Sequence, residues 1–281
     1  MIIESISALR KELKSKGPNA TIGLVPTMGY LHPGHISLIQ KARSQNDIVV
    51  LSIFVNPTQF APNEDLENYP RDLDKDVKAA YDNDVDYIFV PSAKEMYGDH
   101  YSTYVGTEGI ITTKLCGKSR PTHFRGVTTV VSKLFNIVDP TNAYFGLKDA
   151  QQLSVIKRLV IDLNFDINIV SCPIVRNQNG LALSSRNVYL TEDEGQQALV
   201  LSQSLKDAKN LYLTGTTNAL ELKAYIIKAI NAMSLAKIDY VEIVDLETLE
   251  DVDVINKQTL VALAVNFGKT RLLDNIILEV S

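Results

Sequence analysis

The chain has 281 residues, of which 45% are hydrophobic and 22% are charged, and its formal net charge is −5. This length accommodates one large or two smaller domains with a substantial core, and the composition is that of an ordinary globular protein. The acidic balance argues against a general nucleic-acid binder, and no run approaches the roughly 18 apolar residues that a membrane span needs.

The first residues, MIIESISALRKELKSKG, predict a helix with alternating charges. They lack the basic start and the long apolar core of a signal peptide. The only cysteines, Cys116 and Cys172, lie far apart and form no CxxC pair. We therefore expect a protein of a reducing, cytoplasmic compartment.

Strands and helices then alternate along the chain. Buried or β-branched runs predict strands at 21–25, 47–55, 86–91, 143–146 and 167–175. Amphipathic or buried helical spacing predicts helices that start near residue 33 and cover 72–81, 125–138 and 149–164. Repeated strand–helix units predict a parallel sheet with right-handed crossovers, which is a doubly wound, Rossmann-like α/β domain.

The pattern changes after residue 175. A polar loop, RNQNGLALSSRN, is followed by helical periodicity from Thr191 to Met233 and then by three apolar runs that predict a small, antiparallel set of strands. We expect one domain over 1–175 and a smaller α+β domain over 176–281.

The stretch PTMGYLHPGHISL (26–38) contains two histidines, His32 and His35, which flank Pro33-Gly34 at a predicted helix start. The first-turn N–H groups of a helix have no intrahelical partner and the dipole there is positive, so such a start favours a phosphate or another anion. A metal pair is an alternative, but a zinc site needs further ligands and the only other histidines are His100 and His123. A plain turn explains Pro-Gly but not both imidazoles.

Three further polar clusters fall at strand ends or at the domain joint. They are NPTQF (56–60), GLKDAQQ (146–152) and LALSSRN (181–187). Ligands of open parallel sheets bind beyond the carboxyl ends of the strands, so we expect loops of this kind to converge on one pocket.

Six sequence blocks together resemble the pantoate–β-alanine ligase family, a relative of the HxGH-bearing nucleotidyltransferases and class I aminoacyl-tRNA synthetases. The blocks are PTMGYLHPGH, FVNPTQF, YPRDLDKD, RPTHFRGV, YFGLKDAQQL and GLALSSRNVYL, and they span nearly the whole chain. The resemblance implies an ATP-dependent, AMP-forming ligase of pantothenate and coenzyme A biosynthesis. Such an enzyme joins (R)-pantoate to β-alanine through a pantoyl adenylate and releases AMP and pyrophosphate.

The resemblance also assigns residues. The implied ATP-binding residues are Met28, Gly29, Tyr30, Leu31, His32, Pro33, Gly34, His35, Gly146, Leu147, Lys148, Asp149, Val175, Leu183, Ser184, Ser185 and Arg186. The implied catalytic residues are His35, His32, Lys148, Ser184, Ser185 and Arg186. Gln59 is implied to bind pantoate and β-alanine, and Gln152 to bind pantoate. The first domain would bind nucleotide and pantoate, and the second would act as a lid.

These residue types suit the chemistry, because transfer to a phosphate needs positioned donors and cations. Imidazole N–H groups, serine hydroxyls and the forked guanidinium of Arg186 all address phosphate oxygens. Purely structural roles remain as alternatives to phosphate contact. Lys148 and Asp149 would then be a solvated pair at the start of a helix, and the Ser-Ser run would cap a helix. This chain departs from the family pattern at two of these positions: the family usually has Glu where this chain has Leu147, and more often Met where it has Leu183.

Magnesium is expected with the ATP phosphates, but the sequence names no protein ligand for it. The acidic stretch RDLDKD (71–76) would either hold Mg²⁺ through water or be a solvent-facing helix start. Family members are commonly homodimers, which we carry as an expectation, and we expect neither nucleic acid nor membrane as a partner.

Other functions remain as alternatives. A dinucleotide oxidoreductase needs G-x-G-x-x-G after the first strand, and none follows TIGLV. Another HxGH-type nucleotidyltransferase would share the HPGH loop but would not need the glutamines of NPTQF and DAQQ. A non-catalytic nucleotide-binding regulator would keep the fold without a second-substrate pocket.

Overall fold

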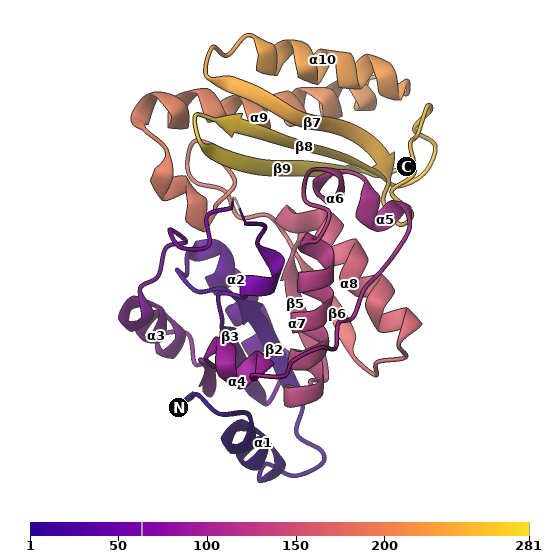
Figure 1. Cartoon of the computed structure of the whole chain (residues 1–281). Helices are drawn as coiled ribbons and strands as arrows, with labels where there is room; N and C mark the ends of the chain where they lie inside the picture. Colours follow the sequence, from indigo (N-terminus) through magenta and orange to yellow (C-terminus); the bar gives the residue numbers. More distant parts are fainter. Residues whose placement is uncertain (63, 281) are drawn as a thin grey trace. The chain divides into compact units, whose positions relative to one another are not determined.

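The computed structural model describes residues 1–62 and 64–280 of the chain (Figure 1). They form two compact units. Unit 1 comprises Met1–Thr107, Thr122–Leu147 and Val155–Pro173, and unit 2 comprises Glu108–Pro121, Lys148–Ser154 and Ile174–Ser281. The last crossing, between Pro173 and Ile174, lies close to the division predicted at 175, but two earlier segments also group with the C-terminal part, which the sequence did not predict.

Unit 1 contains a parallel sheet of six strands. They are β1 (Ile2–Ile3), β2 (Ile22–Thr27), β3 (Ile48–Ile53), β4 (Tyr87–Phe89), β5 (Asn142–Gly146) and β6 (Asn168–Cys172). The strand order is β1-β4-β3-β2-β5-β6, and each paired strand runs parallel to its neighbour. From β2 the chain proceeds to β3 and β4 on one side, and it later returns to β5 and β6 on the other. The order therefore reverses at β2, which confirms the doubly wound prediction and creates a switch point between β2 and β5.

The helices of unit 1 cover this sheet. They are α1 (Ile6–Lys14), α2 (Pro33–Arg43), α3 (Leu73–Tyr81), α4 (Ala93–Tyr97), α7 (His123–Val138) and the greater part of α8 (Ala150–Asp162). One core cluster joins Ile39 of α2 to Val25 of β2 and Leu51 of β3, all fully buried. Burial of such side chains supplies most of the stabilisation, at about 1.5–3 kcal/mol each.

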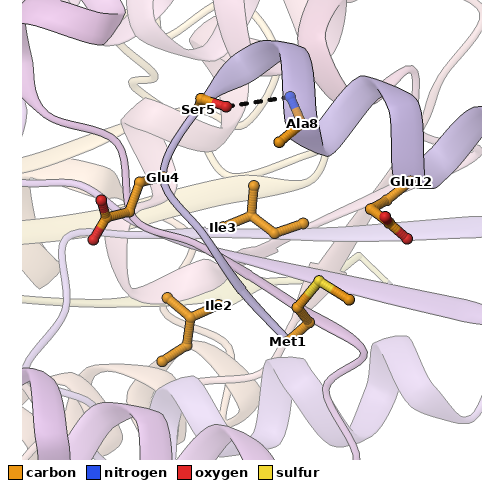
Figure 2. Close-up of a pocket in the computed structure, with 7 residues that line it drawn as sticks. All are labelled: Met1, Ile2, Ile3, Glu4, Ser5, Ala8 and Glu12. Carbon is orange, nitrogen blue, oxygen red and sulfur yellow. Dashed lines mark hydrogen bonds between the residues drawn. The ribbon is translucent and has the colours of Figure 1, made fainter.

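The prediction that the first helix starts at residue 1 is wrong. Ile2 and Ile3 form β1 and pair in parallel with Ile88 and Phe89, and Ile3 is buried. The helix begins only after Ser5, whose Oγ accepts a hydrogen bond from the N–H of Ala8 (Figure 2). Beside this strand lies a shallow hollow of about 480 Å³, which is lined by residues 1–5, Ala8 and Glu12 and contains no predicted site residue.

Unit 2 is built on an antiparallel sheet with two long helices against it. The strands β7 (Ala236–Asp245), β8 (Thr259–Phe267) and β9 (Thr270–Leu278) form the sheet, and α9 (Glu192–Leu213) and α10 (Ala219–Asn231) pack on it through a shared apolar core (Figure 1). This confirms the α+β prediction. The helical periodicity of 191–233 is interrupted at Gly215, whose φ of +113° ends α9.

Two short helices, α5 (Ile110–Thr113) and α6 (Cys116–Ser119), and the first turn of α8 also belong to unit 2. The described helices include none long and apolar enough to span a membrane.

Candidate active site

The loop that follows β2 is held by a buried carboxylate. Asp76 of α3 accepts the N–H of Tyr30 at 2.7 Å and the N–H of Leu31 at 2.6 Å, and its residue is 1% exposed. Tyr30 has a positive φ of +51°, and at Gly29, with φ +81°, an added Cβ would lie 2.9 Å from the Asp76 carboxylate. The carboxylate therefore fixes the path of the loop that leads into the two histidines.

Burial raises the pKa of Asp76, and the bonds from the N–H groups of Leu31 and Tyr30 oppose that rise. Sequence reasoning missed this residue and treated RDLDKD as an ion-binding or solvent-facing stretch. The available signal was its helical spacing, since Asp76 lies four residues before the buried Ala80.

The two histidines cap the start of α2. His32 is the N-cap, and its Nδ1 accepts the N–H of Gly34 at 3.1 Å; Nδ1 of His35 accepts the N–H of His32 at 3.4 Å. The ring centroids lie 4.0 Å apart. A Cβ on Gly34 would lie 2.8 Å from the His32 ring, so glycine is needed there. The predicted helix mouth is confirmed, and both imidazoles lie at it.

The NPTQF segment after β3 lies against this loop. It forms the short 3-10 helix η1 (Pro57–Gln59), and the Nε2 of the buried Gln59 lies 3.2 Å from the sulfur of Met28. The first two predicted clusters therefore meet within unit 1, at the carboxyl ends of the adjacent strands β2 and β3, as the argument from parallel sheets predicted.

The start of α7 packs closely on η1. A Cβ at Gly126 would lie 2.4 Å from the carbonyl oxygen of Thr58 and 2.6 Å from the Gln59 backbone. His123 Nδ1 lies 2.9 Å from the carbonyl oxygen of Gln59. The block RPTHFRGV thus supports the glutamine loop.

At the switch point, β5 ends at Gly146, so this residue lies on the strand next to β2. The chain then forms the 3-10 helix η2 (Leu147–Asp149). Lys148 and Asp149 group with unit 2, where their side chains form a long ion pair of 3.5 Å and the carbonyl of Lys148 accepts from Asn275 Nδ2.

The two glutamines of DAQQ have different environments. Gln151 is buried and ties α8 to α5 and α6, because its Oε1 accepts the N–H of Cys116 and its Nε2 donates to the carbonyls of Ile111 and Lys114. Gln152 is half-buried. The sequence did not distinguish this structural role for Gln151.

The serine loop of unit 2 forms a second capped turn. Ser184 is the N-cap of the 3-10 helix η3 (Ser185–Tyr189): its Oγ accepts the N–H of Arg186 at 3.3 Å, and its own N–H donates to Asn187 Oδ1 at 2.6 Å. Ser185 is buried and Arg186 is half-buried. The capping alternative therefore holds for Ser184.

The polar loop that precedes the serine loop is held by a backbone hydrogen bond and an ion pair within unit 2. Val175 accepts the N–H of Leu183 at 2.9 Å through its carbonyl, and Arg176 forms a two-pronged ion pair with the buried Asp274, at 2.6 and 2.8 Å. The sequence predicted a polar loop here but not the Arg176–Asp274 pair, because the partner lies 98 residues away.

Among residues 1–62 and 64–280, no group of three or more His, Cys, Asp or Glu side chains is arranged to hold a metal ion. Within RDLDKD, Asp72 caps α3 by accepting the N–H of Lys75, and Asp76 holds the loop after β2. Both cysteines are free and buried.

Comparison with known proteins places these features in a family. The model of the family described as pantoate-beta-alanine ligase matches residues 1–277. The chain belongs to the pantoate–β-alanine ligase family. A pantothenate synthetase of Acetivibrio thermocellus is 58% identical over 280 residues, which is 99% of each chain.

Solved structures of this family have the same fold. The pantothenate synthetase of Thermus thermophilus superposes with a TM-score of 0.93 at 41% identity, over 98% of each chain. The pantoate-β-alanine ligase of Francisella tularensis, solved in complex with β,γ-ATP and β-alanine, superposes with a TM-score of 0.82 at 39% identity, over 99% of this chain and 97% of that one. The resemblance read from the six sequence blocks is thereby confirmed.

Proposed function

We propose that this chain condenses (R)-pantoate with β-alanine at the expense of ATP and so forms pantothenate, AMP and pyrophosphate. The observation that carries the proposal is the contact of Gln59 with Met28, in the loop that leads from β2 to the HPGH turn, in a chain that the ligase family covers almost completely. A phosphate-binding helix mouth beside a buried amide suits a nucleotide and a carboxylate substrate together.

In the first step, a carboxylate oxygen of pantoate attacks the α-phosphorus of ATP. The bond from that phosphorus to the bridging oxygen breaks, and pyrophosphate leaves. Each histidine of the HPGH turn accepts a backbone N–H at Nδ1, so its ring N–H lies on Nε2. These Nε2–H groups are the donors that we assign to phosphate oxygens, where charge increases during the displacement.

In the second step, the neutral amine of β-alanine attacks the acyl carbon of the adenylate. AMP leaves with the oxygen that pantoate contributed, and the nitrogen loses a proton as the amide forms. We assign Gln59 to pantoate and to β-alanine, and Gln152 to pantoate, because an amide NH₂ donates to hydroxyl and carboxylate oxygens and the amide oxygen accepts from hydroxyls.

The remaining assignments rest on the family. On that ground we assign the ATP to residues 28–35, to Gly146, Leu147 and Asp149, to Val175 and Leu183, and to the cationic or hydroxyl groups of Lys148, Ser184, Ser185 and Arg186. Mg²⁺ would accompany the ATP phosphates and neutralise part of their charge, and we assign it no protein ligand. We further propose a cytoplasmic homodimer.

ATP–pyrophosphate exchange tests the function. The exchange of labelled pyrophosphate into ATP should require pantoate and should proceed without β-alanine, because the adenylate forms first. Exchange that ignores pantoate would favour another HxGH-type nucleotidyltransferase, and a complete lack of exchange would favour a non-catalytic nucleotide-binding protein.

A further inference from the structure

A chain of hydrogen bonds runs from Tyr97, the last residue of α4, through Asn56 to Gln59. The Tyr97 hydroxyl donates to Asn56 Oδ1, and Asn56 Nδ2 donates to Gln59 Oε1 at 3.0 Å. All three residues belong to unit 1, and Asn56 is 1% exposed. None of the site assignments made above includes Tyr97.

Backbone groups on both sides of the Asn56 amide favour one orientation of it. Its Oδ1 accepts the N–H of Thr58 at 3.3 Å, and its Nδ2 donates to the carbonyl of Gly126 at 3.1 Å. A flipped amide would set the NH₂ against the N–H of Thr58 and the oxygen against the Gly126 carbonyl. Buried amide groups avoid such like-on-like contacts, and the Tyr97 hydroxyl, by donating to Oδ1, adds to the preference for the observed orientation.

The orientation of Asn56 in turn sets the polarity of Gln59. Because an NH₂ group faces Gln59 from Asn56, the glutamine must turn its oxygen to Asn56. Its own NH₂ then lies on the side of Met28, with Nε2 3.2 Å from the sulfur. Gln59 therefore presents a hydrogen-bond donor, not an acceptor, on the side of the loop after β2.

The Tyr97 ring is itself fixed by its neighbours. Its centroid lies 4.8 Å from that of Tyr101 and 6.1 Å from that of Phe54, and the Lys133 ammonium lies 5.8 Å from the Tyr97 centroid. Its hydroxyl also lies 3.2 Å from Thr58 Oγ1. Burial raises the pKa of Tyr97 to about 12, so the hydroxyl keeps its proton, and hence its ability to donate, at neutral pH.

We propose that Tyr97 is a positioning residue of the ligase reaction: by donating to Asn56 it holds the amide that directs the Gln59 NH₂ toward an acceptor oxygen of the carboxylate substrate. The inference rests on the proposed function. It explains why a buried glutamine, which is able to present either end of its amide, recognises the oxygen-rich pantoate as a fixed donor.

Tyr97→Phe tests the proposal, because it removes the hydroxyl and keeps the ring. The loss of one neutral hydrogen bond in the network should lower kcat/KM for pantoate in the exchange reaction about three- to tenfold. The KM for ATP and the melting temperature should change little. The matched control is Tyr101→Phe, which removes the hydroxyl of the adjacent ring and should leave kcat/KM for pantoate unchanged.

A double-mutant cycle separates positioning from general stability. If Tyr97 acts through Gln59, then Tyr97→Phe should have no further effect on pantoate use in a Gln59→Ala background. Additive losses, or a Tyr97→Phe enzyme that uses pantoate as well as the wild type does, would overturn the inference alone. A wild-type protein whose exchange does not depend on pantoate would overturn the proposed function and this inference with it.

Discussion

The histidines of the HPGH turn serve the fold and the proposed chemistry through different nitrogen atoms. Both Nδ1 atoms accept backbone N–H groups at the start of α2. Because Nδ1 accepts in each ring, the ring N–H lies on Nε2. The phosphate contact that we propose is therefore a hydrogen bond from Nε2, made by a ring whose orientation the cap has already fixed.

His35→Ala should slow the formation of pantoyl adenylate by about 10²–10³-fold, because it removes one preorganised donor from the displacement at phosphorus. The attack of β-alanine on preformed adenylate should slow much less. Quenched single-turnover assays of the two half-reactions measure both rates. His100→Ala, at an exposed histidine, serves as the control and should leave both rates unchanged. If only the β-alanine step suffers, His35 acts on the amine and the assignment is wrong.

Asp76→Asn should destabilise the protein by about 1–3 kcal/mol, because an amide accepts one of the two loop N–H groups and turns its NH₂ toward the other. Chemical denaturation at neutral pH measures this loss. Asp72→Asn is the control: Asp72 caps α3 near the surface, and asparagine caps helices equally well. Equal effects from the two substitutions would contradict the role given to Asp76.

The same residue predicts a pH dependence. Its pKa in the folded protein is raised above 3.8, so between 3.8 and the raised value the folded state binds more protons than the unfolded state. The stability that this proton contributes is present below pH 3.8 and is lost as the pH rises through the raised pKa. The difference in the free energy of unfolding between the wild type and Asp76→Asn should therefore shrink as the pH rises through that window. A difference that grows with pH would refute the direction of the pKa shift.

At the scale of elements, the packing of α7 on η1 keeps the glutamine loop in place. Gly126→Ala would push a methyl group into the backbone of Thr58 and Gln59, so we expect a destabilisation of about 1–3 kcal/mol and impaired use of pantoate. Gly195→Ala, in α9, meets no atom within 4 Å and should stabilise the protein by about 0.4–1 kcal/mol. Thermal unfolding measures the stability of the two variants, and the exchange assay measures their use of pantoate. A Gly126→Ala protein as stable and as active as the wild type would contradict the close packing.

Periodicity predicted the elements that bury a regular face, such as β3 and α7, because such runs carry their own signal. It failed where pairing with a distant segment decides the structure. Ile2–Ile3 is a strand only because β4 offers an open edge, and Asp76 is structural only because Tyr30 and Leu31 come within reach. Sequence motifs likewise pointed to the Gln59 loop, but not to Tyr97, whose role depends on a hydrogen bond to a residue 41 positions away.

At the scale of the whole molecule, each of the two units has a core of its own, and the chain crosses between them several times before residue 175. The strand order of unit 1 places the ends of β2 and β3 side by side and β5 next to β2. The topology of unit 1 thus brings the loop after β2 and the Gln59 loop together. The assignments of Lys148, Asp149, Gln152 and the serine loop, which belong to unit 2, rest on family membership.

The route of one oxygen atom tests the complete reaction. Pantoate labelled with ¹⁸O in its carboxylate should transfer one labelled oxygen to the phosphate of AMP, because that oxygen attacks phosphorus and stays there when the amine displaces it from carbon. Mass spectrometry of the AMP measures the label, and the same reaction with unlabelled pantoate in H₂¹⁸O controls for hydrolysis of the adenylate. Label in inorganic phosphate together with ADP would instead indicate an acyl phosphate, and the assignment of the HPGH loop to attack at the α-phosphorus would then be wrong.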